Sequence, residues 1–293
     1  MTANSRINKD NSQRKDIFLK RIHEIDFARG FLILLVVIDH LMFNIKSYFI
    51  VWFGESNGLY QFADFYLNST ARDIIQPICL MLFCFISGIS CVFSRNNLKR
   101  GLMTTGVALL LTLVTRVTQL IVNSNGGNID IAIDLNIIGV LGLSMITYAL
   151  IEKRSYRMIY VLIIFSLLMS SYVNPILRGS LLRLCGGWSN DRPGVDYGIN
   201  GTPNFFMPLF WEYPHTADFV PLFPYMMAFF LGAIFSYYFY KEKRTSLISK
   251  RGNWERPICF IGRHTFVIYL AHIVVITGIF VLINLIVTGG GMI

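Results

Sequence analysis

The chain has 293 residues, of which 54% are hydrophobic and only 15% are charged, and its mean hydropathy is +0.54. Because a soluble domain carries about 25% charged residues, this composition excludes an ordinary soluble enzyme and favours an integral membrane protein. The net charge of +9 does not indicate a nucleic-acid-binding protein, because the basic residues lie in short clusters between apolar segments rather than in one patch.

Seven apolar runs approach the roughly 20 residues that a helix needs to cross a bilayer. They occupy approximately residues 27–47, 74–93, 102–123, 132–151, 157–173, 218–240 and 265–287. The fifth run is the shortest, and Arg116 interrupts the third. A long polar segment precedes the first run and no small-residue cleavage site follows it, so we interpret this run as a membrane helix and not as a signal peptide. The sequence predicts an all-α integral membrane protein, a polytopic bundle of about seven transmembrane helices.

The basic residues predict the orientation of this bundle. They precede the first run and follow the second, fourth and sixth runs, whereas the alternate connections contain few. By the positive-inside rule, the N-terminus is cytoplasmic and the C-terminus is external. We expect residues 1–20 to form a flexible cytoplasmic tail, and residues 21–288 to form one transmembrane domain with external loops at 48–73 and 174–217. The second loop is rich in glycine, proline and aromatic residues, which fits either an ordered lid or an aromatic belt.

The first run, within RIHEIDFARGFLILLVVIDHLMFNI (residues 21–45), carries ionisable groups that lipid cannot satisfy. On an α-helix, Arg29 and His40 differ by about 20° in azimuth and lie about 16 Å apart along the axis. Asp26 lies one turn before Arg29, so the three residues form a stripe that we expect to face the bundle interior. Arg29 fits either a snorkelling residue paired with Asp26 or a ligand-binding residue. His40 fits either an interhelical hydrogen bond or a proton acceptor that Asp39 or a facing residue orients.

The last run repeats this arrangement. It begins with Arg263 and His264 at its cytoplasmic end, and it carries Tyr269 and His272 deeper in the membrane. The two deeper residues either tie helices together or support a site, and the sequence does not distinguish these roles.

Further polar residues lie toward the external ends of other runs. His215 and Asp218 share a helix face where the sixth run begins, and the two prolines that follow them are expected to bend or break the helix. Arg116 in the third run and Asp134 at the start of the fourth form either an ion pair or part of a substrate site.

These residues divide into two groups across the membrane. The external group suits proton transfer to an acceptor, and the cytoplasmic group suits a ligand that carries phosphate. The external group comprises His40, Arg116, Asp134, His215, Asp218 and His272, and the cytoplasmic group comprises Arg29, Arg263, His264 and the cytoplasmic basic loops. The two groups together predict a reaction or a passage across the membrane.

Several segments resemble known membrane acyltransferases. Arg29 and His40 match the Arg-x10-His pattern of the acyltransferase-3 family. EIDFARG and the later segments resemble the catalytic-domain family of heparan-α-glucosaminide N-acetyltransferase, in particular its small bacterial members. The later segments are LMLFCFISGIS (80–90), LLLTLVTR (109–116), NIIGVLGLSMI (136–146), ADFVPLFPYMMAFFLGAI (217–234) and IGRHTFVIYLAH (261–272). They occur in the expected order and cover most of residues 20–280.

The resemblance implies a membrane acyltransferase that moves an acyl group, typically acetyl, from cytoplasmic acyl-CoA to a carbohydrate or glycolipid hydroxyl or amine at the external face. It implies that His40 is the catalytic base and Arg29 its partner, and that the Asp218, Arg263, His264 and His272 regions line the site. The expected location is a bacterial plasma membrane, and a homo-oligomer is compatible with the sequence. The five cysteines form no framework, so we expect no disulfide and no metal.

The chemistry that we expect places the phosphates of acyl-CoA near Arg29 and Arg263, with Arg116 or Tyr269 stabilising the oxyanion. Transfer can be direct or can pass through an acyl-histidine, and the sequence leaves both open. Two other functions use the same polar residues. One is a proton-coupled transporter or channel, and the other is a non-catalytic membrane scaffold.

Overall fold

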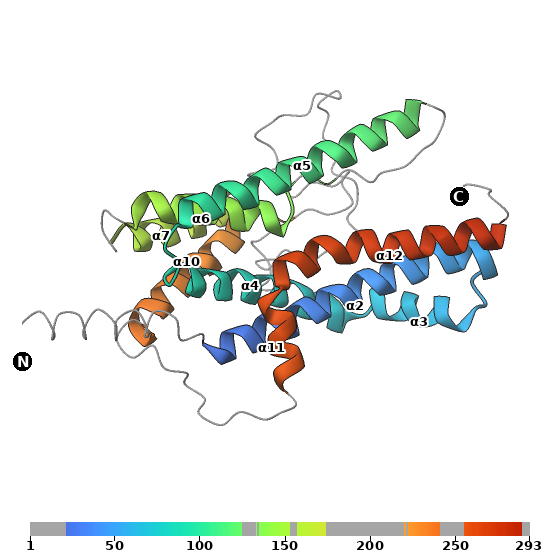
Figure 1. Cartoon of the computed structure of the whole chain (residues 1–293), viewed down its shortest axis with the longest axis horizontal. Helices are drawn as coiled ribbons and strands as arrows, with labels where there is room; N and C mark the ends of the chain where they lie inside the picture. Colours follow the sequence, from blue (N-terminus) through green and yellow to red (C-terminus); the bar gives the residue numbers. More distant parts are fainter. Residues whose placement is uncertain are drawn as a thin grey trace, which may run out of the picture. The chain divides into compact units, whose positions relative to one another are not determined.

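The computed structural model describes residues 22–124, 133, 135–152, 157–173, 220, 222–240 and 255–288, and every element within these residues is an α-helix (Figure 1). This confirms the predicted all-α class for the described part of the chain. The helices are α2 (His23–Phe53), α3 (Gly58–Leu67), α4 (Thr70–Cys91), α5 (Asn97–Ser124), α6 (Ile137–Ile151), α7 (Arg157–Val173), α10 (Leu222–Phe239), α11 (Glu255–Arg263) and α12 (Thr265–Thr288). The predicted tail at 1–20 and the predicted loop at 174–217 lie outside the described residues.

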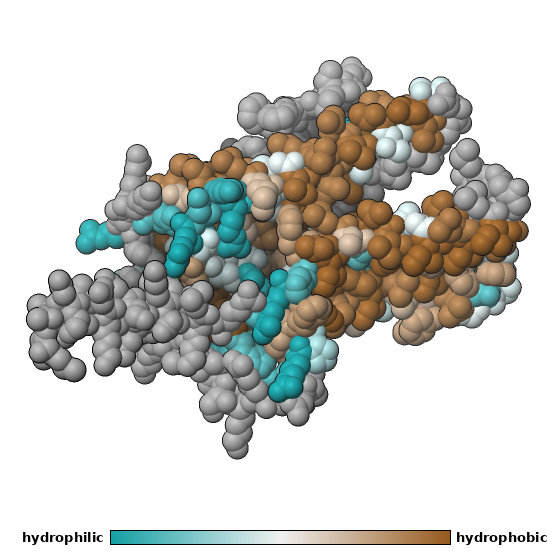
Figure 2. All heavy atoms as spheres, in the orientation of Figure 1, coloured by the Kyte–Doolittle hydropathy of each residue, from teal (hydrophilic) through white to brown (hydrophobic). Residues whose placement is uncertain are grey.

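Four helices in the described part are long and apolar enough to cross a membrane: Thr70–Cys91, Asn97–Ser124, Leu222–Phe239 and Thr265–Asn284. They coincide with the second, third, sixth and seventh predicted runs. The fourth and fifth runs form the shorter apolar helices Ile137–Ile151 and Arg157–Leu168, and the first run lies within the 31 residues of α2. Apolar side chains cover α5 and α12 in Figure 2, which is the surface that a helix presents to lipid.

The described chain divides into two compact units. The first contains residues up to Ile75 and from Lys243 onward, and the second runs from Gln76 to Glu242. The first unit therefore holds α2, α3, α11, α12 and the beginning of α4. The second holds the rest of α4 with α5, α6, α7 and α10.

In the first unit α12 lies beside α2 and runs in the same direction (Figure 1). The rings of His40 and His272 lie 4.8 Å apart, and those of Tyr48 and Phe280 lie 5.3 Å apart. Further along, the Trp52 indole nitrogen donates to the Asn284 side-chain oxygen at 2.8 Å. Because residue numbers rise together along the two helices, the helices are parallel.

Helix α11 crosses α2 at a contact between two glycines. A Cβ on Gly30 would collide with the carbonyl of Ile258, and a Cβ on Gly262 would collide with the carbonyl of Asp26. Only glycine lets two helix backbones approach this closely. A contact between His23 Nε2 and the Glu255 carboxylate at 2.7 Å and the ion pair of Asp26 with Arg263 at 3.2 Å also join the two helices.

Residues 48–73, predicted as a loop, are largely helical. Helix α2 continues to Phe53 because Tyr48 and Trp52 pack against Phe280 of α12. It ends at Gly54, whose φ of 75° is readily adopted by glycine. Asn57 then caps α3, because its side chain accepts a hydrogen bond from the backbone nitrogen of Leu59 at 2.9 Å. A short break after Leu67 separates α3 from α4.

In the second unit, glycines again mark close helix contacts. A Cβ on Gly88 of α4 would collide with the carbonyl of Phe229, and a Cβ on Gly232 of α10 would collide with the carbonyl of Phe85. Helix α10 contains one non-helical residue, Phe223, immediately before Pro224. Proline disfavours helical backbone at the preceding residue, so the structure confirms the bend that the sequence predicts there.

Candidate functional site

The two histidines predicted in the membrane core meet across α2 and α12. Their ring centroids are 4.8 Å apart and their planes are almost perpendicular, at 89°. The Nδ1 atom of His40 lies 3.0 Å from the carbonyl oxygen of Val36, and Nδ1 of His272 lies 3.2 Å from that of Ile268. Because a carbonyl only accepts, each Nδ1 carries a hydrogen and donates it. In a neutral ring Nε2 then keeps a lone pair that can take a proton.

The Nε2 atom of His272 is buried and has no hydrogen-bond partner among the described residues. The His272 side chain is only 6% exposed, and the Tyr269 ring lies 5.4 Å from it. A buried polar atom without a partner costs about 1–3 kcal/mol. Such an atom is expected where a ligand supplies the missing donor.

The histidine pair lies near the middle of the length that α2 and α12 share. By the helical rise, His40 is about 21 Å from Asp26 toward one end and about 18 Å from Trp52 toward the other. Asp26 pairs with Arg263, and Trp52 bonds to Asn284, so polar contacts mark both ends of this helix pair. The two contacts are therefore about 39 Å apart along the axis, which exceeds the hydrocarbon core of a bilayer, about 30 Å, and is close to its full thickness of about 40–45 Å.

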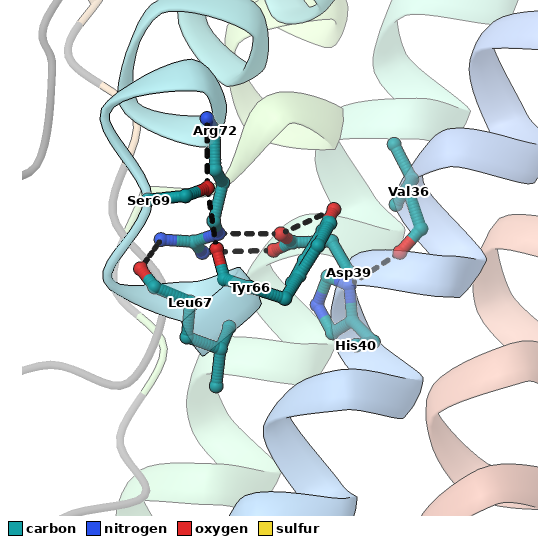
Figure 3. Close-up of polar contacts among 7 residues, drawn as sticks. All are labelled: Val36, Asp39, His40, Tyr66, Leu67, Ser69 and Arg72. Atoms are coloured by element: carbon teal, nitrogen blue, oxygen red, sulfur yellow. Dashed lines mark hydrogen bonds and ion pairs between the residues drawn. The ribbon is translucent and has the colours of Figure 1, made fainter. Parts of the chain in front are cut away.

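Asp39 immediately precedes His40 in α2 but contacts a different helix. Its carboxylate accepts two hydrogen bonds from Arg72 at the beginning of α4, from Nε at 2.6 Å and from Nη2 at 3.0 Å. The Tyr66 hydroxyl also donates to Asp39, at 3.4 Å. Figure 3 shows the Arg72 guanidinium facing this carboxylate, whereas His40 bonds to Val36. Of the two alternatives left open by the sequence, Asp39 or a facing residue, the described structure shows Asp39 bonded to Arg72, while the Val36 carbonyl holds the His40 ring.

Sequence reasoning missed Arg72 and Tyr66. Arg72 precedes the second apolar run by two residues, so it was assigned to an external loop together with Tyr66. The available signal was the charge of Asp39, which needs a basic partner inside an otherwise apolar helix.

The predicted cytoplasmic group also comes together in part. Asp26 of α2 pairs with Arg263 of α11, and the two side chains are 14% and 46% exposed. Arg29 follows Asp26 by one turn and is half-buried, and His264 lies exposed between α11 and α12, with Nδ1 donating to the carbonyl of Phe260 at 3.0 Å. This end of the first unit therefore presents basic side chains from two helices.

The remaining predicted residues lie in the second unit or outside the described residues. Arg116 lies on α5, in the second unit, and Asp134, His215 and Asp218 lie outside the described residues. Within the described ranges, no three histidine, cysteine, aspartate or glutamate side chains gather to hold a metal ion.

A further ion pair, between α2 and α3, is more exposed than the pair of Asp39 and Arg72. The Lys46 ammonium lies 2.7 Å from Asp64, and these side chains are 33% and 38% exposed. This hydrogen bond holds the pKa of Asp64 below its ordinary value. Exposed pairs stabilise proteins by about 0–1 kcal/mol, so this pair is a useful comparison for Asp39 and Arg72.

The comparisons with known proteins support one family. The family model described as heparan-α-glucosaminide N-acetyltransferase, catalytic, matches residues 21–274. The comparisons with curated proteins and with solved structures found no match. The family match supports a membrane acetyltransferase and gives no support to a transporter or channel. Since the matched segment covers most of the chain's 293 residues, the chain belongs to the catalytic family of heparan-α-glucosaminide N-acetyltransferase.

Proposed function

We propose that this membrane acetyltransferase moves an acetyl group from cytoplasmic acetyl-CoA to an amine or hydroxyl of a carbohydrate at the external face. The observation that carries the proposal is the pair of His40 and His272, in which Nδ1 of each ring is held by a backbone carbonyl. This arrangement leaves two basic nitrogens between parallel helices, and one of these helices, α12, is among those in the described part that are long and apolar enough to cross a membrane.

In this proposal His40 is the general base. The hydrogen bond from Nδ1 to Val36 fixes the tautomer, so Nε2 is available to remove a proton from the acceptor amine or hydroxyl. Acetyl-CoA, when bound, supplies a thioester whose carbonyl carbon is attacked by the acceptor nitrogen or oxygen; the C–S bond breaks, and the CoA thiolate leaves as the thiol after taking the proton held on His40. Tyr269, from the same helix as His272, is the donor that we propose for the developing oxyanion.

The buried Nε2 of His272 fits this substrate complex, because it lacks a partner in the described structure and lies beside the proposed base. We propose that it accepts a hydrogen bond from the acceptor and so holds the nucleophile against His40. Arg29, Arg263 and His264 are proposed to bind the phosphate-bearing end of acetyl-CoA, with arginine as the main contact, and Asp26 is proposed to hold Arg263 in place through their ion pair. Arg116, Asp134, His215 and Asp218 stay predictions from sequence.

The parallel course of α2 and α12 supports the proposed topology of seven spans. If both helices cross the membrane in the same direction, the number of crossings from the first to the last must be odd. Within the described residues, five further apolar helices (α4, α5, α6, α7 and α10) lie between them in the chain, which gives seven candidate crossings in that part of the chain. The basic residues before α2 support a cytoplasmic N-terminus.

Replacing His272 with phenylalanine is expected to weaken acceptor binding without damaging the fold. Phenylalanine keeps a planar ring but removes Nε2, so KM for the acceptor should rise about tenfold, the equivalent of roughly 1.4 kcal/mol. The melting temperature should stay the same or rise, because an unsatisfied buried polar atom is removed. Steady-state kinetics and thermal unfolding of the purified variant test both points. A fall in melting temperature with an unchanged KM would show that Nε2 is satisfied within the protein.

The donor and acceptor classes are tested with purified protein in nanodiscs. Radiolabelled acetyl-CoA is supplied with a panel of amino sugars and polysaccharide fragments, and free CoA and labelled product are measured. We expect stoichiometric release of CoA and acetylated product with at least one amino sugar. The proposed donor would be wrong if the protein neither bound nor consumed acetyl-CoA. It would also be wrong if the protein consumed only longer acyl-CoAs.

A further inference from the structure

The ion pair between Asp39 and Arg72 connects the proposed base to a break in a second helix. The chain runs back along α2 as α3, breaks at Asn68 and Ser69, and resumes as α4. Arg72 lies in the first turn of α4. Its guanidinium makes a bidentate contact with Asp39, the residue that precedes His40 in α2. Both side chains are largely buried, at 17% and 18% exposure.

The break itself is closed by polar contacts that converge on Arg72 (Figure 3). The Ser69 hydroxyl donates to the Tyr66 carbonyl at 2.7 Å and accepts from the backbone nitrogen of Arg72 at 3.3 Å. The Nη1 atom of Arg72 donates to the carbonyl of Leu67 at 3.4 Å, while Nε and Nη2 bond to Asp39. Arg72 thus joins the end of α3, the beginning of α4 and the middle of α2.

This contact fixes the rotation of α2 where His40 projects. Successive residues on a helix differ by about 100° in azimuth, so Asp39 is directed at Arg72 while His40 is directed at His272 of α12. A planar guanidinium bonded through two nitrogens constrains both distance and angle, which a single contact does not. A buried ion pair is weak evidence for stability, and its best-attested use is to specify one arrangement of helices.

We propose that Arg72 is a positioning residue for His40, acting through Asp39 to hold the base against His272 and the acceptor. This inference rests on the proposed acetyltransferase function. Since a displacement of about 1 Å at a reacting group can cost about 100-fold in rate, the ion pair is expected to act on kcat. The phosphate-binding end of the site lies more than one helical turn away, so KM for acetyl-CoA is expected to stay unchanged.

The test compares Arg72→Gln, Asp39→Asn and the exchanged pair Asp39→Arg with Arg72→Asp, each as the full chain in nanodiscs. Arg72→Gln and Asp39→Asn should each lower kcat about 100-fold per folded molecule, and the exchanged pair should recover at least tenfold of that loss. The matched control is Lys46→Gln with Asp64→Asn, which removes the exposed ion pair between α2 and α3 and should leave kcat unchanged. If the variants yielded less folded protein but the folded molecules kept the wild-type kcat, the ion pair would have a structural role only, and the proposal would be overturned.

A second readout does not depend on activity. In protein labelled with ¹⁵N-histidine, the His40 signals are identified by their absence in His40→Gln. Arg72→Gln should shift these signals, and Lys46→Gln should not. If the wild type makes no acetylated product yet the His40 signals shift, the proposed function fails while the positioning contact stands. If the wild type is active and the His40 signals and kcat are unchanged in Arg72→Gln, the positioning role is wrong and the proposed function stands.

Discussion

Replacing His40 with glutamine is expected to reduce acetyl transfer about 100- to 10,000-fold, the range that a general base contributes. Glutamine keeps a polar side chain of similar length, but its amide has no nitrogen that takes up a proton near neutral pH. The expected loss is in kcat, because the proposed proton transfer occurs in the reaction step and not in the binding of acetyl-CoA. Rates of CoA release and of product formation in nanodiscs measure it.

The matched control is Ser47→Ala. Ser47 lies on nearly the same face of α2 as His40, two turns further along, and its exposed hydroxyl donates only to the carbonyl of Phe43. This variant should retain wild-type kcat. If a folded His40→Gln protein transferred acetyl groups at a wild-type rate, another residue would be the base, and the histidine pair would serve to pack α2 against α12.

Replacing Gly30 with valine is expected to destabilise the first unit strongly. A Cβ at this position already collides with the backbone carbonyl of Ile258, and backbone cannot move aside as the end of a flexible side chain can. Separating α2 from α11 would also pull apart the contacts of Asp26 with Arg263 and of His23 with Glu255. We expect a loss of about 3 kcal/mol or more, measured as a lower melting temperature and a lower yield of monodisperse protein.

Gly278 on α12 provides the matched control, since no other part of the described structure lies within 4 Å of a Cβ at this position. Gly278→Val should melt close to the wild type, because valine has a somewhat better helix propensity than glycine. Gly262→Val should behave like Gly30→Val, because its Cβ meets the Asp26 carbonyl from the other side of the same crossing. Normal melting of Gly30→Val would show that α2 and α11 do not touch through their backbones.

The helices were predictable because apolar runs of membrane-spanning length leave few alternatives. The residues of all seven runs that the structure describes lie mainly in helices, with Phe223 before Pro224 as the predicted bend. The end of α2 was not predictable in this way. Tyr48 and Trp52 were assigned to the external loop at 48–73, beyond the end of the first apolar run, yet they extend the helix by packing on Phe280 of α12. That partner is more than two hundred residues away in sequence.

The candidate site was predictable where periodicity within one helix was enough. The spacing along each run identified His40 and His272 as intramembrane histidines, and the structure places them together. It did not indicate that they would meet each other, because that requires the relative register of α2 and α12. Arg72 was missed for a similar reason. Its pairing with Asp39 depends on the break between α3 and α4, and the sequence indicated a loop there.

The glycine contacts also give a physical reason for part of the family resemblance. Gly30, Gly88, Gly232 and Gly262 each lie within a segment that carries the resemblance, and each is a position where an added Cβ would collide with another helix. These segments therefore hold residues that determine how closely helices pack, in addition to the polar residues of the proposed site.

The most direct test of the account measures transfer between two compartments. Purified protein is reconstituted into sealed liposomes that contain radiolabelled acetyl-CoA, and the amino sugar accepted in nanodiscs is added outside only. We predict labelled acetylated sugar outside, free CoA inside, and at least a 100-fold slower reaction with His40→Gln. Product that forms only when donor and acceptor share a compartment would contradict transfer across the membrane through the site between α2 and α12.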